Sequence, residues 1–160
     1  MNVFAEVGQR IVAALEQLKA DGKLPADLPL DAVQTPEEPR DLKPGDMATN
    51  AALALAKAAR MKPRDIADLL AARLQSDPDV TKAEVAGPGF INLTFAPGFW
   101  HGVVSAILAR GATYGRSTIG NGQSVDIEYV SANPTGPMHI GHCRGAVFGD
   151  ALASLLDHAG

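Results

Sequence analysis

Two histidines near the end of the chain, His139 and His142, carry the strongest chemical signal in the sequence. They follow a Gly/Pro-rich turn, residues 131–138, that joins two periodic segments. Alternating apolar and acidic residues over 125–130 predict a strand, and apolar residues at helical spacing from Ile140 to Leu156 predict a helix. The two histidines would share a face at the start of that helix, where free N–H groups and the macrodipole favour an anion. The pattern therefore predicts a phosphate or nucleotide site.

Three other interpretations of this segment fit less well. The glycines after residue 135 lack the G-x-G-x-x-G spacing of a dinucleotide fingerprint. A phosphate loop would need Lys where His142 stands and Ser or Thr where Cys143 stands. A metal pair is disfavoured because a cation would face the positive end of a helix and no carboxylate lies at ligand spacing. We therefore expect no metal site.

Gly141, Gly145 and Gly149 form a stripe along one face of the predicted helix. Each costs a helix interior about 1 kcal/mol relative to alanine. We therefore expect either the sheet or a flat ligand to approach this face closely. Cys143, one residue past the second histidine, is expected to be a small residue of the core.

This segment resembles the start of the catalytic domain of a class I aminoacyl-tRNA synthetase, most closely that of the bacterial arginyl-tRNA synthetase family. The matching residues are 125–137, the His-Ile-Gly-His tetrapeptide at 139–142, 144–147 and 149–152. The resemblance continues backward through residues 114–116, 87–93, 49–52 and 45–46, so that it covers nearly the whole chain.

The resemblance implies a two-step reaction. Arginine attacks the α-phosphate of ATP to give arginyl-adenylate and pyrophosphate, and the 3′-terminal hydroxyl of tRNA then takes the arginyl group. The implied partners are L-arginine, the tRNA for arginine and ATP with its Mg²⁺, without a tightly bound metal or organic cofactor. The resemblance also implies that the protein is cytoplasmic, that its full-length form is a monomer and that it has no membrane partner.

The resemblance also assigns roles to residues. His139 and His142 would be catalytic, donating hydrogen bonds to phosphate oxygens as charge develops. Glu128 would pair with the arginine guanidinium, and Ser131 and Asn133 would bind the amino and carboxyl ends of arginine. The implied ATP-binding run is Ala132, Asn133, Pro134, Thr135, Gly136, Pro137, Met138, His139, Ile140, Gly141 and His142.

Plainer roles stay open for the arginine-binding candidates when the residues are considered alone. Glu128 is also typical of an exposed strand position, Asn133 of a turn before Pro134, and Ser131 of a turn or cap hydroxyl.

A basic cluster, Lys57, Arg60, Lys62 and Arg64, lies where two predicted helices meet. Such a cluster alone is typical of a solvated surface, and the net charge of −4 argues against a general nucleic-acid binder. The resemblance favours tRNA, so we interpret the cluster and Asn50 as tRNA-binding. Asn50 is equally typical of a polar residue at a helix start.

Composition and patterning predict an α/β fold. With 46% hydrophobic residues the chain can form a core, its single cysteine excludes an internal disulfide framework and suits a reducing compartment, and no run has the length of a membrane span. Expected helices cover residues 1–20, 47–60, 63–76 and 99–110. Expected strands cover residues 32–34, 80–85 and 90–95.

We expect a small antiparallel sheet with helices over residues 1–112, similar to the N-terminal additional domain that contacts the tRNA elbow at the D-loop in arginyl-tRNA synthetases. Residues 113–123 would be a linker. Residues 124–160 would be the first strand and helix of a Rossmann-like class I catalytic domain. The second signature loop and an anticodon domain are absent from the sequence, so this portion is expected to be inactive alone.

Two other functions remain open from the sequence. One is a small nucleotidyltransferase with the H-x-G-H motif that acts on a substrate other than tRNA. The other is a non-catalytic tRNA- or RNA-binding module that consists of the N-terminal domain and a vestigial helix.

Overall fold

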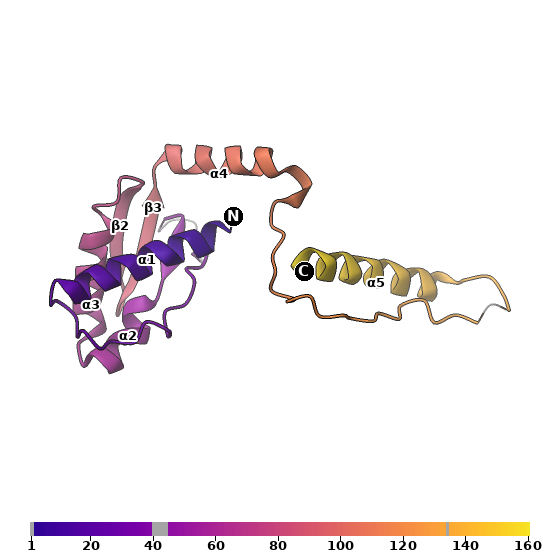
Figure 1. Cartoon of the computed structure of the whole chain (residues 1–160), viewed down its shortest axis with the longest axis horizontal. Helices are drawn as coiled ribbons and strands as arrows, with labels where there is room; N and C mark the ends of the chain where they lie inside the picture. The colour runs from indigo at the N-terminus through magenta and orange to yellow at the C-terminus, as the bar shows by residue number, and fades with distance from the viewer. Residues whose placement is uncertain (1, 40–44, 134) are drawn as a thin grey trace. The chain divides into compact units, whose positions relative to one another are not determined.

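The computed structural model describes residues 2–39, 45–133 and 135–160, so Pro134 of the expected ATP-binding run lies outside the described residues. The chain divides into two compact units, residues 1–110 and 111–160. Figure 1 shows the elements of each unit.

The first unit begins with the predicted amphipathic helix, α1 (Val3–Ala20). Asn2 is its N-cap, and its side-chain oxygen accepts hydrogen bonds from the backbone N–H of Phe4 at 3.0 Å and Ala5 at 3.3 Å. The remaining elements, in chain order, are β1 (Met47–Thr49), α2 (Ala51–Ala59), α3 (Pro63–Leu74), β2 (Val80–Ala86), β3 (Phe90–Phe95) and α4 (Pro97–Arg110).

The three strands form a small antiparallel sheet, as predicted, in the order β1-β3-β2, although β1 lies where a helix was expected. β2 and β3 form the expected hairpin, and Gly89 in its turn has φ +153° and packs against Pro63 at the start of α3. A Cβ at Gly89 would lie 3.0 Å from Pro63 Cβ, so this position needs glycine for space as well as for its backbone conformation.

Alternation along β3 gives the sheet one buried and one open face. Ile91, Leu93 and Phe95 are buried in the core, whereas Phe90 is exposed and Asn92 is half-buried on the opposite face. The helices contribute the rest of the core through their apolar stripes, with Ile11, Leu15, Leu55, Ile66 and Leu70 fully buried. The open face of the sheet is thereby left available for a ligand.

Two expected elements of this unit are wrong in detail. Residues 32–34 form no strand, because the backbone turns at 31–32 and pairs with β1 only at the isolated bridge between Glu37 and Ala48. The helix expected from Met47 begins at Ala51, because Met47–Thr49 pairs with β3. Burial of Met47 and Thr49 in the sheet outweighs the helical preference of the alanine-rich sequence that follows.

The second unit contains a short 3₁₀ helix, Gly111–Thr113, and one long helix, α5 (Ile140–Ala159). α5 agrees with the prediction, but the strand expected over residues 125–130 is not formed. A strand exists only with a hydrogen-bonded partner, and the described part of this unit offers no second strand.

α5 leaves much of its apolar surface open. Ile140, Val147, Phe148 and Leu155 are exposed, and Cys143 is exposed as well, so its expected place in a core is wrong for this chain. The cysteine lies on a helix face that the rest of the unit does not cover. Among the described residues, no helix has both the length and the apolar character that a membrane crossing requires.

Candidate active site and nucleic-acid interface

His139 and His142 close the N-terminal end of α5 through each other. His139 is the N-cap, with extended backbone at φ −107° and ψ 173°, and its Nδ1 accepts a hydrogen bond from Gly141 N at 3.1 Å. His142 is the third helical residue, and its Nδ1 accepts from His139 N at 3.3 Å. Together they form a capping box in which two imidazoles replace the usual hydroxyl and carboxylate.

This arrangement fixes which ring nitrogens can meet a ligand. A ring nitrogen that accepts a hydrogen bond carries no proton, so the proton of each neutral imidazole is on Nε2. The two rings stack with centroids 3.7 Å apart and planes inclined by 21°. The site therefore presents two neighbouring Nε2–H donors, which can form hydrogen bonds with the acceptor oxygens of a phosphate.

The backbone contributes less to anion binding than the sequence suggested. The N–H groups of Gly141, His142 and Cys143 all have partners, on the Nδ1 or the carbonyl oxygen of His139. Because these amides are occupied, the imidazole donors rather than the backbone would meet an incoming phosphate.

The glycine stripe of α5 allows the close approach that was predicted, but the approaching group is Tyr129 of a segment without regular structure, rather than a sheet or a flat ligand. The Tyr129 side chain lies against Gly149, where any Cβ would overlap it, and the Tyr129 carbonyl oxygen would lie 3.1 Å from a Cβ at Gly145. Gly141 faces the His139 ring, whose Cε1 would lie 2.9 Å from an added Cβ. Two glycines of the stripe, Gly145 and Gly149, thus let Tyr129 lie directly against α5.

Two of the three expected arginine-binding residues lie together. The Ser131 hydroxyl donates to Glu128 Oε1 at 2.7 Å, and both side chains are exposed. Asn133 is exposed too. Of the expected ATP-binding residues, Ala132 and His142 are half-buried, whereas Thr135, Gly136, Pro137, Met138, His139, Ile140 and Gly141 are exposed. Among the described residues, no group of three or more His, Cys, Asp or Glu side chains could hold a metal ion.

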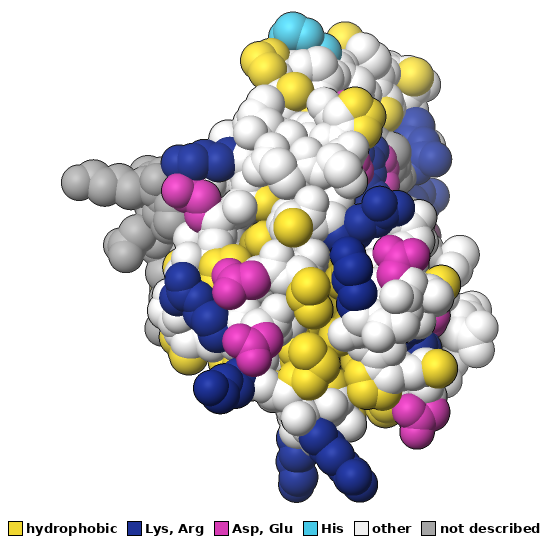
Figure 2. Space-filling model, turned by 90° about the vertical axis from the view of Figure 1, so that its left-hand side faces the viewer, with side chains coloured by type: hydrophobic (Ala, Val, Ile, Leu, Met, Phe, Trp, Pro, Cys, Tyr) yellow, Lys and Arg dark blue, Asp and Glu magenta, His cyan; other side chains and the backbone are white. Residues whose placement is uncertain are grey.

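The basic cluster lies at the junction of α2 and α3, with all four side chains exposed. Arg60 ends α2 in the left-handed conformation at φ 53°, and Lys62 is the N-cap of α3. Arg64 is partly engaged, since its Nη1 donates to Gly87 O at 3.1 Å. Figure 2 shows both basic and acidic side chains on one face of the molecule, so the charge there is mixed.

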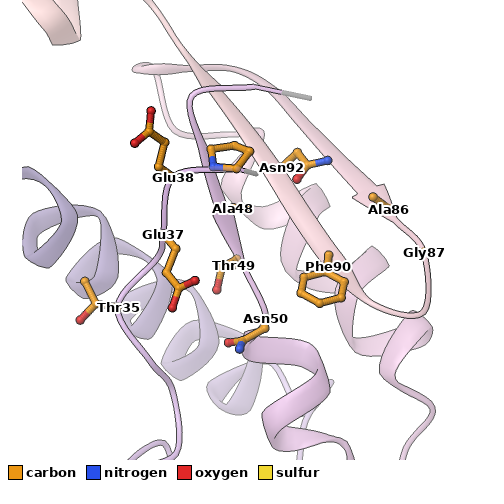
Figure 3. A pocket seen from close by; sticks show the side chains of 11 residues that line it. Thr35, Glu37, Glu38, Ala48, Thr49, Asn50, Ala86, Gly87, Phe90 and Asn92 are labelled. Atoms are coloured by element: carbon orange, nitrogen blue, oxygen red, sulfur yellow. The ribbon is translucent and has the colours of Figure 1, made fainter. Parts of the chain in front are cut away.

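Asn50 lies at the N-cap of α2, but its side chain makes no capping hydrogen bond. Instead its Nδ2 donates to Gln34 Oε1 at 3.4 Å, and the residue lines a hollow of about 610 Å³ on the open side of the sheet. Figure 3 shows the Phe90 ring and the Asn50 side chain at this hollow, with the carboxylate of Glu37 on the side of Asn50 and that of Glu38 pointing away. Asn92 on β3 also lines this hollow.

Phe90 and Asn92 were assigned by sequence only to a strand. The signal that marks them is the alternation of β3, because Phe90 falls on the polar face and is 43% exposed. An aromatic side chain on the open face of a sheet can stack on an unpaired base, and amide groups beside it can form hydrogen bonds with the edge of that base.

The chain matches two protein-family models. Residues 5–95 match the model described as the arginyl-tRNA synthetase N-terminal domain. Residues 103–160 match the model of the class I tRNA synthetase catalytic domain of the arginine type.

Similar proteins include the arginine–tRNA ligases of Ruegeria pomeroyi, 61% identical, and of Paracoccus denitrificans, 59% identical, each over the whole of this chain and 27% of that protein. The chain therefore spans about a quarter of the length of these relatives. Among solved structures, the arginyl-tRNA synthetase of Thermus thermophilus is 27% identical, with a TM-score of 0.55 over all of this chain and 24% of that one.

Proposed function

The chain belongs to the arginyl-tRNA synthetase family, and we propose that it is the N-terminal part of an arginine–tRNA ligase that works in the cytoplasm as a monomer. In that reaction the arginine carboxylate attacks the α-phosphate of ATP, which is bound with Mg²⁺, and pyrophosphate leaves. The 3′-terminal hydroxyl of the tRNA then attacks the arginyl carbonyl and AMP leaves. This chain would supply the histidine pair, one side of the arginine site and a tRNA-binding surface.

The observation that carries the catalytic proposal is the imidazole capping box at the start of α5. Both Nδ1 atoms accept backbone hydrogen bonds, at 3.1 and 3.3 Å, so both Nε2–H groups are held as donors by the helix itself. Donors that are oriented before the reaction stabilise charge as it develops on the phosphate oxygens, without a cost of reorganisation. The histidines therefore act electrostatically and need not take up a proton.

Asparagine at position 139 separates the capping role from the donor role. Asparagine is a good N-cap, so His139→Asn keeps the helix start and removes the Nε2–H donor. In the full-length protein we expect arginine-dependent ATP–pyrophosphate exchange to lose about a hundred- to a thousandfold in turnover, with little change in the Michaelis constant for ATP.

Circular dichroism of the same His139→Asn variant controls for loss of α5. A variant that keeps its helix content and its turnover would contradict the catalytic assignment. A rise in the ATP Michaelis constant alone would mean that the donor serves ground-state binding instead.

The tRNA proposal rests on two features of the first unit. The hollow over the open face of β1 and β3 is lined by the exposed Phe90 and by the amides of Asn50 and Asn92, a set that suits one unstacked base. The exposed basic cluster at the α2–α3 junction suits the phosphate backbone. Because Arg64 is tied to Gly87 O, Lys57 and Lys62 are the better candidates for direct phosphate contacts.

Salt dependence distinguishes these two contributions to tRNA binding by the 160-residue chain. We expect Lys57→Ala with Lys62→Ala to reduce the slope of log affinity against log salt by roughly 0.7 to 0.9 for each phosphate that these lysines neutralise. The matched control, Lys23→Ala with Arg73→Ala, removes the same charge elsewhere on the unit and should keep the slope. Equal slopes in both double variants would exclude the cluster.

Phe90→Ala should behave differently, because it removes a stacking surface and no charge. We expect it to weaken tRNA binding by about 1–3 kcal/mol with an unchanged salt slope, whereas Phe90→Tyr keeps the ring and should bind like the parent chain. Unchanged affinity in Phe90→Ala would contradict a base-binding role for the hollow.

A further inference from the structure

The carboxyl end of α5 is closed by the segment that precedes residues 125–130. The last carbonyl groups of a helix have no partners within it. Here Arg116 Nη2 donates to Asp157 O at 3.0 Å, Ser117 N to His158 O at 3.0 Å, and Gly120 N to Ala159 O at 3.0 Å. Gly122 N continues the series with a hydrogen bond of 3.1 Å to Gly160 O. We call residues 114–122 the clamp.

Side chains strengthen the clamp on both sides. The Arg116 guanidinium also pairs with the Asp157 carboxylate, and His158 Nε2 lies 3.3 Å from Tyr114 O. A cation beside the last turn of a helix is favoured by the helix macrodipole. Arg116 is therefore the side chain that joins the clamp to both a backbone carbonyl and a carboxylate of α5.

The backbones in the clamp approach closely. A Cβ at Gly120 would overlap Gly160 O, although Gly120 itself does not need the left-handed backbone conformation. Close packing, rather than conformation, therefore requires glycine at this position. A single methyl group at residue 120 would push the clamp off the helix.

We propose that Arg116 is a positioning residue for His139 and His142, which act at the opposite end of α5. The helix has 20 residues and is about 30 Å long, so a tilt of about 3° at the clamp moves its other end by about 1.5 Å. A misplacement of about 1 Å can cost about a hundredfold in rate. Arg116 thus acts on the histidine pair through a rigid helix and touches neither ATP nor arginine; this role rests on the proposed function.

Hydrogen exchange of the 160-residue chain tests the clamp itself. In the parent chain we expect protected amides over residues 150–160 and at Ser117 and Gly120. Arg116→Ala and Gly120→Ala should raise exchange over residues 150–160 by about tenfold or more. Gly102→Ala is the matched control, because no atom lies within 4 Å of the added methyl group. Unprotected amides in the parent chain, or equal exchange in all variants, would overturn the clamp.

Kinetics of the full-length protein test the positioning role. Arg116→Ala and Gly120→Ala should lower the turnover of arginine-dependent ATP–pyrophosphate exchange by about ten- to a hundredfold, with the ATP Michaelis constant changed by about twofold or less. Arg116→Lys keeps the charge and one donor, so it should retain more turnover than Arg116→Ala. Gly102→Ala should match the parent.

The outcomes separate the two proposals. If hydrogen exchange shows a released clamp while turnover is unchanged, Arg116 has no positioning role. If His139→Asn leaves turnover unchanged, the proposed catalytic function fails whatever the clamp variants do. If Arg116→Ala does not fold, the turnover of Gly120→Ala and of Arg116→Lys is compared with that of the parent instead. Equal turnover in all three proteins would overturn the proposal.

Discussion

His139 and His142 combine two tasks that proteins usually divide between residues. Their Nδ1 atoms satisfy backbone donors at the start of α5, and this leaves only Nε2 for a ligand. A capping Asp or Glu would satisfy the same backbone groups but would present an acceptor-only carboxylate to the phosphate, which needs donors. Other residues could cap this helix, but the site as we propose it needs histidine at both positions for the Nε2–H donors.

Glu128 is the residue whose proposed role depends most on charge. Its carboxylate accepts the Ser131 hydroxyl at 2.7 Å and is otherwise open to a guanidinium. Glu128→Gln keeps the shape and removes the charge, and loss of one partner of a desolvated pair costs about 3 to 5 kcal/mol. In the full-length protein we therefore expect the Michaelis constant for arginine to rise by at least a hundredfold, while that for ATP is nearly constant.

Asp126→Asn is the matched control for Glu128→Gln, since Asp126 is an exposed carboxylate on the same segment. It should change neither Michaelis constant appreciably. An arginine value that does not move in Glu128→Gln would make Glu128 an ordinary exposed residue, and the assignment of the histidines would be unaffected.

At the scale of elements, Arg10 ties α1 to the start of the β2 strand and to α4. Its Nη1 lies 2.8 Å from Asp79 Oδ2 and 3.1 Å from Asp77 Oδ2, its Nη2 lies 3.1 Å from Glu6 Oε1, and its guanidinium carbon is 5.4 Å from the centre of the Phe99 ring. Burial lowers the pKa of Arg10, but hydrogen bonds with Asp79 and Glu6 outweigh this and raise the pKa above its ordinary value.

Arg10→Ala should lower the free energy of unfolding of the first unit by about 1–3 kcal/mol, because three half-buried carboxylates lose their cation. Urea denaturation followed by Trp100 fluorescence measures this, since Trp100 packs on Phe95 and Phe99. Arg73→Ala, which breaks one exposed bond to Gln17, should cost less than about 0.5 kcal/mol. Equal losses in the two variants would contradict the prediction.

The sign of the Arg10 pKa shift also limits its effect on pH dependence. Because the pKa of Arg10 is higher in the folded protein than in the unfolded chain, the stabilisation from its charge is complete at any pH below the unfolded-state pKa. It is lost only as the pH rises through the folded-state pKa, which is higher still. The Arg10 guanidinium itself should therefore add no change in stability between about pH 5 and 9.

Long periodic elements could be predicted from the sequence, and short or partner-dependent ones could not. Apolar periodicity was sufficient to predict the helices α1, α3, α4 and α5. The glycines between β2 and β3 were sufficient to predict the hairpin. β1 was missed because its three residues are held by pairing with β3, more than forty residues away, as in the pair Met47 and Leu93. The strand expected over 125–130 failed for the same reason, since its pattern specifies a strand but cannot supply a partner.

The candidate site was predicted in its residue types and only partly in its geometry. The sequence placed both histidines on one face of a helix, whereas His139 lies before the first turn and caps it. Side-chain capping by imidazole leaves no periodic signal. Phe90 was missed because apolar residues are expected in strands on either face, and only the observed exposure of its ring distinguishes it.

At the scale of the whole molecule, the two units differ in how completely they bury their apolar surface. The first unit encloses a continuous core from α1 to α4. In the second unit, α5 exposes Ile140, Val147 and Phe148, and the proposed donors and carboxylate are exposed with them. Electrostatic catalysis depends on donors fixed in a site from which water is excluded, and the described residues provide no such enclosure.

We therefore expect the 160-residue chain alone to show no arginine-dependent ATP–pyrophosphate exchange, with or without tRNA, while it still binds tRNA through the first unit. The measurement needs a no-enzyme control and the double variant His139→Ala, His142→Ala. Exchange that survives the double variant comes from a contaminating enzyme. Exchange that the double variant abolishes would mean that these residues suffice for adenylate formation, and that an exposed imidazole pair can stabilise the phosphate without enclosure.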